Sequence, residues 1–512
     1  MDEDTTKVGR RWLALILLGV LLHAGAFFNS DLGLDAHVRL NAISDEVHEG
    51  QALGWGKLRI PAESVQSPNA SVIYDGYIPP WSTSETAMKL TSLVALMAVA
   101  GLAAIVPKWQ RNRGHVEMLW PVLILMSPVF LFAVGRGYDE PMVALLIGMG
   151  TGGFFLNKGD EPHQIRVHLL LLATSLLLVM GWKGFAMISA FGVWLLVIGL
   201  GSTWIELERR QRSKTGETWL SHPWFMGGAL SLSVYLSMFV AGFLAESGTF
   251  AIVGEQPVKY ALASLFALVD ALGIFLLLGF AFWPFISSSF VHLQGLRGPG
   301  ITLLVMFISG LLTAIIGYIA ALWTLESTLW GLSMTETMVL LGNNGRYATC
   351  LVIPLVMMIN WERSSPAVQS ASKTSLVVAC CLLLPAVVFT SFVGQQLWSE
   401  DAGEGLHEVM IDGDSSILLV APDALAMHHL YVLKTHVDLD GTSEIDGFWR
   451  TSQEAALFID DATVKPDLVV IAPNTKLSLD DQQWELIVEG KSPVTVTGWT
   501  DDGSWRIYRY VV

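Results

Sequence analysis

The chain carries little charge for its length. Only 15% of its 512 residues are charged, whereas a soluble globular protein has about 25%. Hydrophobic residues make up 52% of the sequence, and the mean hydropathy is +0.51. These values exclude an ordinary soluble domain and predict an integral membrane protein with many apolar spans.

Cysteines and basic clusters are also scarce in the sequence. The three cysteines, Cys350, Cys380 and Cys381, all lie in apolar runs, so the sequence offers neither a disulfide framework nor zinc-ligand spacing. The net charge is −16, and no basic cluster is interleaved with aromatic residues. Nucleic acid is therefore not an expected partner.

Apolar runs long enough to cross a bilayer fill most of the first 393 residues. A spanning helix needs about 20 apolar residues, and on that basis we expect about eleven spans. The sequence predicts a polytopic α-helical membrane domain over 1–393, with a first outer loop over 30–86. The expected spans cover residues 12–29, 87–107, 118–135, 141–157, 167–182, 184–204, 222–244, 259–283, 301–323, 346–360 and 375–396.

The basic residues between these spans indicate an orientation. With the N-terminus inside the cell, fifteen lysines and arginines fall in inner segments and eight in outer segments. This asymmetry favours a cytoplasmic N-terminus in the cell membrane. An odd number of spans then places the C-terminal part outside. Cleavage of a signal peptide at Ala24-Gly25-Ala26 is the alternative, although the apolar run continues beyond that point.

The last part of the chain, 394–512, differs sharply in charge. It holds 21 acidic and 7 basic residues, a net of −14, which leaves −2 for the remainder. Short apolar strands are expected at Ile417–Val420, Leu468–Ile471, Val494–Val496 and Trp505–Val512, with a helix at Ser452–Ile459. We therefore predict a small extracytoplasmic α/β domain. It lacks a Gly-rich phosphate loop, so a structural or acceptor-gripping role is expected of it.

The polar stretch after the first span is the main candidate for chemistry. It contains Asp31, Asp35, His37 and Arg39. If this stretch is helical, Asp31 and Asp35 lie on one face at the membrane surface. A carboxylate partly shielded from water there can serve as a general base or a cation ligand. The purely structural interpretation is that Asp31 caps a helix and Asp35 pairs with Arg39.

A second candidate site lies in the short outer turn between the third and fourth spans. It contains Arg136, Asp139 and Glu140. Two adjacent acids can bind a hard divalent cation or accept hydrogen bonds from sugar hydroxyls. The structural alternative is a solvated turn in which one of the acids pairs with Arg136.

Two basic residues at the expected outer boundary of the membrane are further candidates for the site. Arg346, followed by Tyr347, stands just outside the tenth span, and Lys183 lies in a turn between two other spans. Either side chain can bind a lipid phosphate. Ordinary snorkelling to the membrane surface is the simpler interpretation of both.

Together these acids and bases at headgroup depth fit one reaction. Glycosyl transfer from a polyprenyl-phosphate sugar needs a carboxylate to deprotonate the acceptor hydroxyl and cations to stabilise the departing phosphate. We therefore expect a polyprenyl-phosphate sugar donor and membrane lipid as partners. The acceptor, whether protein, lipid or glycan, stays open.

The chain resembles the GT-C glycosyltransferases, in particular the branch of protein O-mannosyltransferases and lipid A aminoarabinose transferases, archaeal members above all. Asp31 and Asp35-Ala36-His37 match the acidic motif after the first span of that branch. Asp139-Glu140 match its second-loop acid, and Arg346-Tyr347 match an Arg-Tyr that enters a late span. The resemblance implies catalysis by Asp35 or Asp31. The expected substrate-binding residues are His37, Arg136, Asp139, Glu140, Lys183, Arg346 and Tyr347. Ala36 departs from the branch's frequent Asp-Glu pair, and we favour Asp35 as base.

Two of these motifs are also similar to oligosaccharyltransferases. Gly33-Leu34-Asp35 fits their G-x-D, and Tyr138-Asp139-Glu140 is similar to their metal-binding acids. That resemblance implies a divalent cation, Mg or Mn, on Asp35, Asp139 and Glu140. Their Trp-Trp-Asp motif is absent, so this interpretation ranks second, and no cofactor is certain.

Two alternatives belong to other classes of protein. Asp270 lies within an apolar run, where an ionisable group indicates a functional site such as that of a transporter or flippase. A hydrogen-bonded acid inside a helix bundle is the structural alternative. The external domain could also be the working part of an assembly protein, in which case the isolated domain would bind the partner.

Overall fold

The structure, a computed structural model, describes most of the chain. Contacts divide it into two compact units, and each is described by itself. Unit 1 comprises Met1–Ala26, Ser92–Val134 and Asp139–Phe392, and unit 2 comprises Phe27–Thr91, Gly135–Tyr138 and Val393–Val512. The described residues are 3–44, 83–111, 117–156, 222–245, 249–362, 371–393, 396–422, 425–439, 442–443, 445–460, 465–492 and 503–511.

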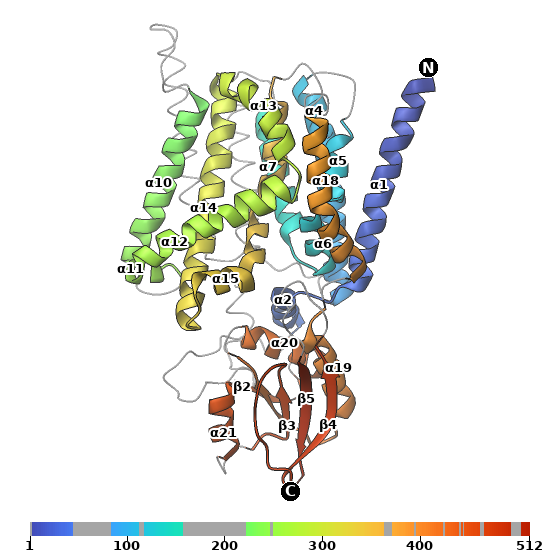
Figure 1. Cartoon of the computed structure of the whole chain (residues 1–512), viewed down its shortest axis with the longest axis vertical. Coiled ribbons are helices and arrows are strands. Elements are labelled where there is room, and N and C mark those ends of the chain that lie inside the picture. Colours follow the sequence, from blue (N-terminus) through green and yellow to red (C-terminus); the bar gives the residue numbers. More distant parts are fainter. Residues whose placement is uncertain are drawn as a thin grey trace. The chain divides into compact units, whose positions relative to one another are not determined.

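Unit 1 is built from helices, and the axes of its long helices α4, α10, α14 and α18 are roughly parallel or antiparallel (Figure 1). Their lengths follow from the long apolar runs, since each turn of helix satisfies its own backbone groups. In chain order the unit contains α1 (Glu3–Asn29), α4 (Glu85–Arg111), α5 (Leu119–Leu125), α6 (Pro128–Gly135), α7 (Glu140–Leu156), α10 (Pro223–Leu244), α11 (Ile252–Glu255), α12 (Pro257–Leu268), η2 (Val269–Leu278), α13 (Trp283–Gly295), α14 (Pro299–Leu329), α15 (Met334–Leu341), η3 (Gly342–Leu351), α16 (Val352–Asn360), α18 (Lys373–Val388) and η4 (Phe389–Val393).

Within the described residues, six helical stretches are long and apolar enough to cross a membrane. They are Arg10–Asn29, Glu85–Pro107, Pro223–Leu244, Pro257–Leu278, Gly300–Leu329 and Lys373–Val409. A mostly helical protein with several spans is thus confirmed. The expected spans 167–182 and 184–204 lie outside the described residues, and the count of eleven stays a prediction.

Three interruptions shape the remaining expected spans. The run 118–135 divides into α5 and α6 because Pro128 has no N–H to continue the helix. The run 259–283 changes from α-helix to the wider π-helix η2 at Val269, and Asp270 lies in its first turn. The run 346–360 starts in the tight 3-10 helix η3 and continues as α16. Such irregular turns are often functional.

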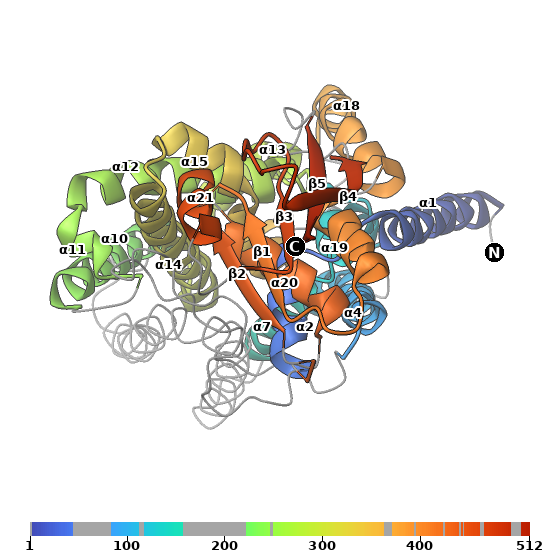
Figure 2. The same cartoon turned by 90° about the horizontal axis from the view of Figure 1, so that it is seen from below.

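Unit 2 combines a mixed sheet with helices (Figure 2). Within the described residues the sheet has five strands in the order β2-β1-β3-β5-β4. Strand β1 is parallel to β2 and β3, whereas β5 is antiparallel to β3 and β4. The elements are α2 (Leu34–Ser44), α19 (Trp398–Val409), β1 (Ser416–Val420), α20 (Ala426–Val437), β2 (Asp446–Arg450), α21 (Ser452–Asp460), β3 (Leu468–Ile471), β4 (Trp484–Lys491) and β5 (Ser504–Tyr510).

Strand alternation gives the sheet two apolar faces. Ile417 and Leu419 of β1 pack with residues of α19 and α20, and Leu418 and Val420 pack with Phe458 of α21. Successive side chains of a strand point to opposite faces, so one short apolar strand serves both cores. The sheet is thus covered by α19 and α20 on one face and by α21 on the other.

The predicted α/β character of the C-terminal segment is confirmed in its elements. Strands β1, β3 and β5 and helix α21 lie where the sequence predicts them. The expected strand Val494–Val496 lies outside the described residues. The division at residue 393 and the extracytoplasmic side stay predictions, and unit 2 also includes Phe27–Thr91.

Candidate functional site

The acidic stretch after the first span lies in unit 2. Helix α2 begins only at Leu34, so Asp31 precedes it and Asp35 stands in its first turn. The expectation that both carboxylates share one helical face is therefore wrong. Gly33 lies just before α2, and its N–H donates to the carbonyl oxygen of Arg136 at 2.9 Å. A Cβ at Gly33 would clash with the ring of Tyr138, so glycine permits this close approach.

Asp31 contacts the C-terminal part of unit 2. The N–H of Leu397 donates to Asp31 Oδ2 at 2.5 Å, so Asp31 does not act as the cap of α2. Burial raises the pKa of Asp31 to about 6, against the opposing effects of the Leu397 hydrogen bond and the charge of Arg136. A carboxyl group with this pKa ionises close to neutral pH, which is the range in which a general base works best.

Asp35 keeps more access to solvent. Its side chain is 32% exposed, and its Oδ1 lies 3.8 Å from His428 Nε2. Burial lowers the pKa of His428, and the charge of Asp35 opposes that shift. Asp35 is thus a fixed but accessible carboxylate beside an imidazole that is neutral at physiological pH.

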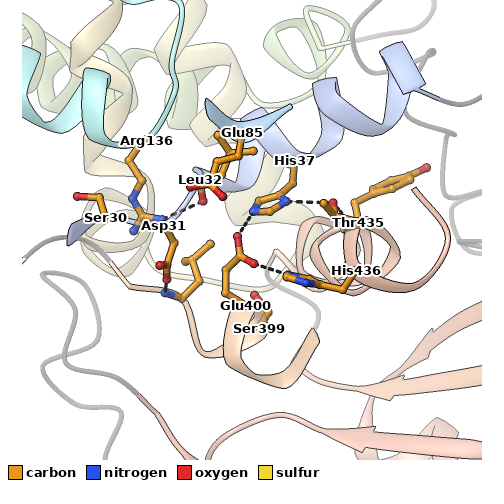
Figure 3. Close-up of polar contacts among 12 residues, drawn as sticks. Ser30, Asp31, Leu32, His37, Glu85, Arg136, Ser399, Glu400, Thr435 and His436 are labelled. Atoms are coloured by element: carbon orange, nitrogen blue, oxygen red, sulfur yellow. Dashed lines mark hydrogen bonds and ion pairs between the residues drawn. The ribbon is translucent and has the colours of Figure 1, made fainter. Parts of the chain in front are cut away.

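A glutamate flanked by two histidines lies below this stretch (Figure 3). Glu400 Oε1 forms an ion pair with His37 Nε2 at 2.6 Å, and Oε2 contacts His436 Nε2. His37 Nδ1 lies 3.0 Å from Thr435 Oγ1. His37 is only 2% exposed, so both of its ring nitrogens face protein groups. Three elements, α2, α19 and α20, meet at this cluster.

The two helices under α2 also bond to each other and to α2. Ser399 Oγ of α19 lies 2.8 Å from His429 Nδ1 of α20. Burial and the neighbouring charges of His428, His37 and Arg136 lower the pKa of His429 to about 3, so its ring is neutral. Asn41 of α2 is fully buried and donates to the carbonyl of Tyr431 at 3.0 Å.

Three basic side chains donate hydrogen bonds to backbone carbonyls in this part of unit 2. Arg136 donates to the carbonyl oxygen of Leu32 at 3.4 Å, and Arg39 donates to that of Gly137 at 3.2 Å. The ammonium group of Lys89 donates to the carbonyl of Ser30 at 2.5 Å. Lys89 and Arg136 thus contact the backbone on either side of Asp31, where they add positive potential.

The second-loop acids and Arg346 lie in unit 1. Arg346 Nε donates to Glu140 Oε1 at 2.9 Å, and both side chains are almost completely buried. Ordinary snorkelling to the membrane surface does not describe Arg346, because its side chain is buried in unit 1 and pairs with Glu140 of α7. Its guanidinium also stacks on Tyr347, 4.9 Å from the ring centroid. Asp139 is buried too, at 5% exposure.

Asp270 supports the same 3-10 segment. Its Oδ2 accepts a hydrogen bond from the N–H of Gly345 at 2.8 Å, so two acids, Glu140 and Asp270, bond to neighbouring residues of η3. The predicted substrate contacts of Asp139, Glu140, Arg346 and Tyr347 stay predictions. Lys183 lies outside the described residues.

A metal site does not emerge from the residues that the structure describes: no three histidines, cysteines or acids among them are grouped to hold an ion. Glu140, one of the expected ligands, gives an oxygen to Arg346 instead. The expected metal set of Asp35, Asp139 and Glu140 combines residues of both units and stays a prediction.

Sequence reasoning missed Glu400 and the histidines of α20. The available signal was a concentration of histidines, since His428, His429 and His436 fall within a single amphipathic helix of an otherwise acidic segment. The pairing of Glu400 with His37 joins residues more than 350 positions apart in the sequence, and no local pattern encodes such a contact.

Comparison with known proteins finds similarity to solved structures. No protein-family model and no curated protein matches it. Among solved structures it is similar to ArnT from Cupriavidus metallidurans bound to undecaprenyl phosphate, with 12% identity, 98% of each chain covered and a TM-score of 0.45. It is also similar to the apo state of that protein, with 12% identity, 99% and 98% covered, and a TM-score of 0.39.

Proposed function

We propose that the chain is a membrane glycosyltransferase of GT-C type. It moves a sugar from a polyprenyl-phosphate donor to an acceptor hydroxyl by inverting displacement, at the extracytoplasmic face of the cell membrane. The N-terminus is cytoplasmic in this proposal, and the C-terminal segment is extracytoplasmic, as the distribution of basic residues favours. The ArnT structure is described as bound to undecaprenyl phosphate, a ligand of the class proposed here.

The observation that carries the proposal is the placement of Asp35. The candidate span Arg10–Asn29 ends just before it, and its carboxylate is fixed at the start of α2 with 32% of the side chain exposed. A carboxylate that takes a proton from an acceptor must keep some access to solvent, and Asp35 does. An accessible carboxylate at the end of a span is suited to contact an acceptor that arrives from water and a donor held in lipid.

The proposed reaction has three coupled changes. Asp35 takes the proton of the acceptor hydroxyl, the acceptor oxygen bonds to C1 of the sugar, and the bond between C1 and the phosphate oxygen breaks. The phosphate leaves on its prenyl chain with the electron pair of that bond. Asp31 is the second candidate for the base, and Arg136, whose charge acts on Asp31, is a cation of unit 2 that could stabilise developing negative charge.

Donor consumption by the purified protein in lipid tests the proposal. We expect wild type to consume a polyprenyl-phosphate sugar and Asp35→Asn to lose about a hundredfold or more. Asp412→Asn, which changes an exposed acid of unit 2, is the matched control and should keep full activity. Equal consumption by Asp35→Asn and wild type would remove Asp35 as base, and Asp31→Asn would then be compared.

The same assay separates the alternatives. Loss of activity in EDTA would favour the metal-dependent oligosaccharyltransferase type, whereas activity in EDTA would favour the aminoarabinose transferase type. A protein that binds no polyprenyl-phosphate sugar at all would contradict the proposal. Transport that fails in Asp270→Asn would then favour a carrier, although the Asp270 carboxylate already accepts the Gly345 N–H.

A further inference from the structure

We infer that Glu400 is a positioning residue for the first-loop carboxylates: by joining His37 of α2 to His436 of α20, it fixes the helix that carries Asp35. The C-terminal segment thereby becomes part of the catalytic apparatus. This inference rests on the proposed function for its catalytic meaning, but its structural content can be tested without any turnover.

The geometry places Glu400 between the two elements that it joins. Its two carboxylate oxygens face different imidazoles, Oε1 toward His37 and Oε2 toward His436, as Figure 3 shows. The Glu400 side chain is 13% exposed and that of His37 is 2% exposed. Contacts between charged groups are worth more under such shielding than on an open surface. Each histidine projects from a different helix, so the carboxylate connects α2 to α20 through α19.

Hydrogen-bond directions determine where the protons of this cluster lie. The hydroxyl of Thr435 donates to the carbonyl of Tyr431 at 2.9 Å, so its oxygen accepts from His37 Nδ1. His37 therefore uses one N–H on Thr435 and presents its other nitrogen to Glu400. A carboxylate only accepts, so His37 and Glu400 together hold one proton more than a neutral imidazole and a carboxylate have.

Further contacts make α2 depend on the C-terminal segment along its length. Asp31, just before the helix, accepts from Leu397 N–H, and Asn41, in its later half, donates to Tyr431 and Thr435. Asp35 lies between these points and has His428 within 3.8 Å. A shift of α19 that releases Glu400 would therefore also move Asp31 and Asp35.

The contact of Glu400 with His436 is sensitive to pH. Burial alone would lower the pKa of His436, but its hydrogen bond to Glu400 and the charge of that carboxylate raise it. The contact between Glu400 and His436 is therefore complete at mildly acidic pH and weakens as His436 loses its proton. The other charged or titratable groups around Glu400 are Asp31, Asp35, Glu85, Lys89, Arg136, Asp401, Glu404, His428 and His429.

Hydrogen–deuterium exchange of the full-length protein in lipid tests the structural part. We compare the peptide that covers 34–44 in wild type, Glu400→Gln and His436→Gln, at about pH 6 and about pH 8, corrected for intrinsic exchange. Glu408→Gln, an exposed position on the same helix, is the control. At the lower pH we expect both cluster variants to exchange at least about tenfold faster in this peptide, while the control matches wild type. In wild type we expect faster corrected exchange at the higher pH. Exchange in Glu400→Gln equal to wild type at both pH values would overturn the inference.

Steady-state kinetics tests the catalytic part. Loss of positioning should lower kcat by about tenfold to a hundredfold, since a displacement of about 1 Å can cost that much, with little change in KM for the donor. Glu400→Asp, which keeps the charge, should recover part of the loss. If kcat is unchanged while exchange increases, the positioning role is refuted and only a structural one is left. If wild type consumes no donor, the proposed function fails, and the exchange experiment still decides whether Glu400 holds α2.

Discussion

Each compact unit contains a buried or nearly buried glutamate that ties distant elements together, but the two have different partners. In unit 1, Glu140 of α7 pairs with Arg346 of η3. In unit 2, Glu400 of α19 pairs with His37 and His436. A guanidinium stays charged at any physiological pH, whereas an imidazole loses its proton near neutrality. The first pair is therefore a permanent connection, and the second is conditional on pH.

The largest effect is expected from breaking the permanent pair. Arg346→Met leaves Glu140 buried without its cation, which costs about 3–5 kcal/mol in a buried pair. Thermal unfolding in detergent or lipid should show a correspondingly large loss of stability. The double variant Arg346→Met/Glu140→Leu should recover much of it because no charge is then left unpaired. A double variant as unstable as the single one would show that the pair matters for another reason.

A smaller loss is expected at the conditional pair. Glu400→Gln keeps the shape of the side chain but removes its charge, and hydrogen bonds to charged groups contribute about 1.5–3 kcal/mol. Unfolding measured at mildly acidic pH should show a loss in this range. The double variant with His37→Gln should cost less than the two single changes added together, since both remove the same contact. Strict additivity would contradict a direct interaction.

A loss of stability comparable to that of Glu400→Gln, or smaller, is expected from a substitution in η3, the 3-10 helix that carries Arg346. A Cβ at Gly345 would lie 2.4 Å from Phe275 Cδ2 and 2.6 Å from Asp270 Oδ2. Gly345→Ala should therefore cost about 1–3 kcal/mol through overpacking and weaken the hydrogen bond from the Gly345 N–H. Gly342→Ala, where a Cβ would meet open space, is the matched control. Equal stability of the two variants would mean that the segment moves aside freely.

The smallest effect is the pH dependence itself. The pKa of His436 is raised in the folded protein, so its stabilising contribution is complete below the unfolded value near 6.5 and is lost as pH rises through the folded value. Unfolding temperatures between about pH 6 and about pH 8 should therefore fall more for wild type than for Glu400→Gln. The Arg346 pair gives no such change in this window. Parallel pH profiles for wild type and Glu400→Gln would remove the distinction between the two pairs.

The sequence predicts the elements of this protein better than its contacts. Three of the described strands were predicted because Ile417–Val420, Leu468–Ile471 and the last strand are short apolar runs between polar turns. Strand β2 was missed since its sequence, Asp446–Arg450, begins and ends with charge, and β4 because polar residues interrupt it. A continuous apolar run identifies a strand that is buried on both faces. It does not identify the strands at the edges of the sheet, β2 and β4, because their sequences contain polar residues.

At the candidate site, too, the sequence identifies residues but not the partners that they contact. A polar stretch after an apolar span was enough to single out Asp31, Asp35 and His37. Helix α2 begins only after Asp31, at Leu34, and Gly33 before it packs against the ring of Tyr138, a residue far along the chain. The partners of His37 and Arg346 likewise come from distant segments, and opposite charges in one sequence do not indicate which ones will meet.

The composition of unit 2 has a consequence for how the protein is made. The unit combines Phe27–Thr91 with Val393–Val512, so a ribosome synthesises one part roughly 300 residues before the other. At about 5–20 residues per second, the first segment waits on the order of 15–60 s for its partner. During that interval Asn41 and His37, both buried in the finished fold, have no α20 to bond to. A chaperone or the translocation machinery has its longest opportunity to bind the nascent chain at this segment.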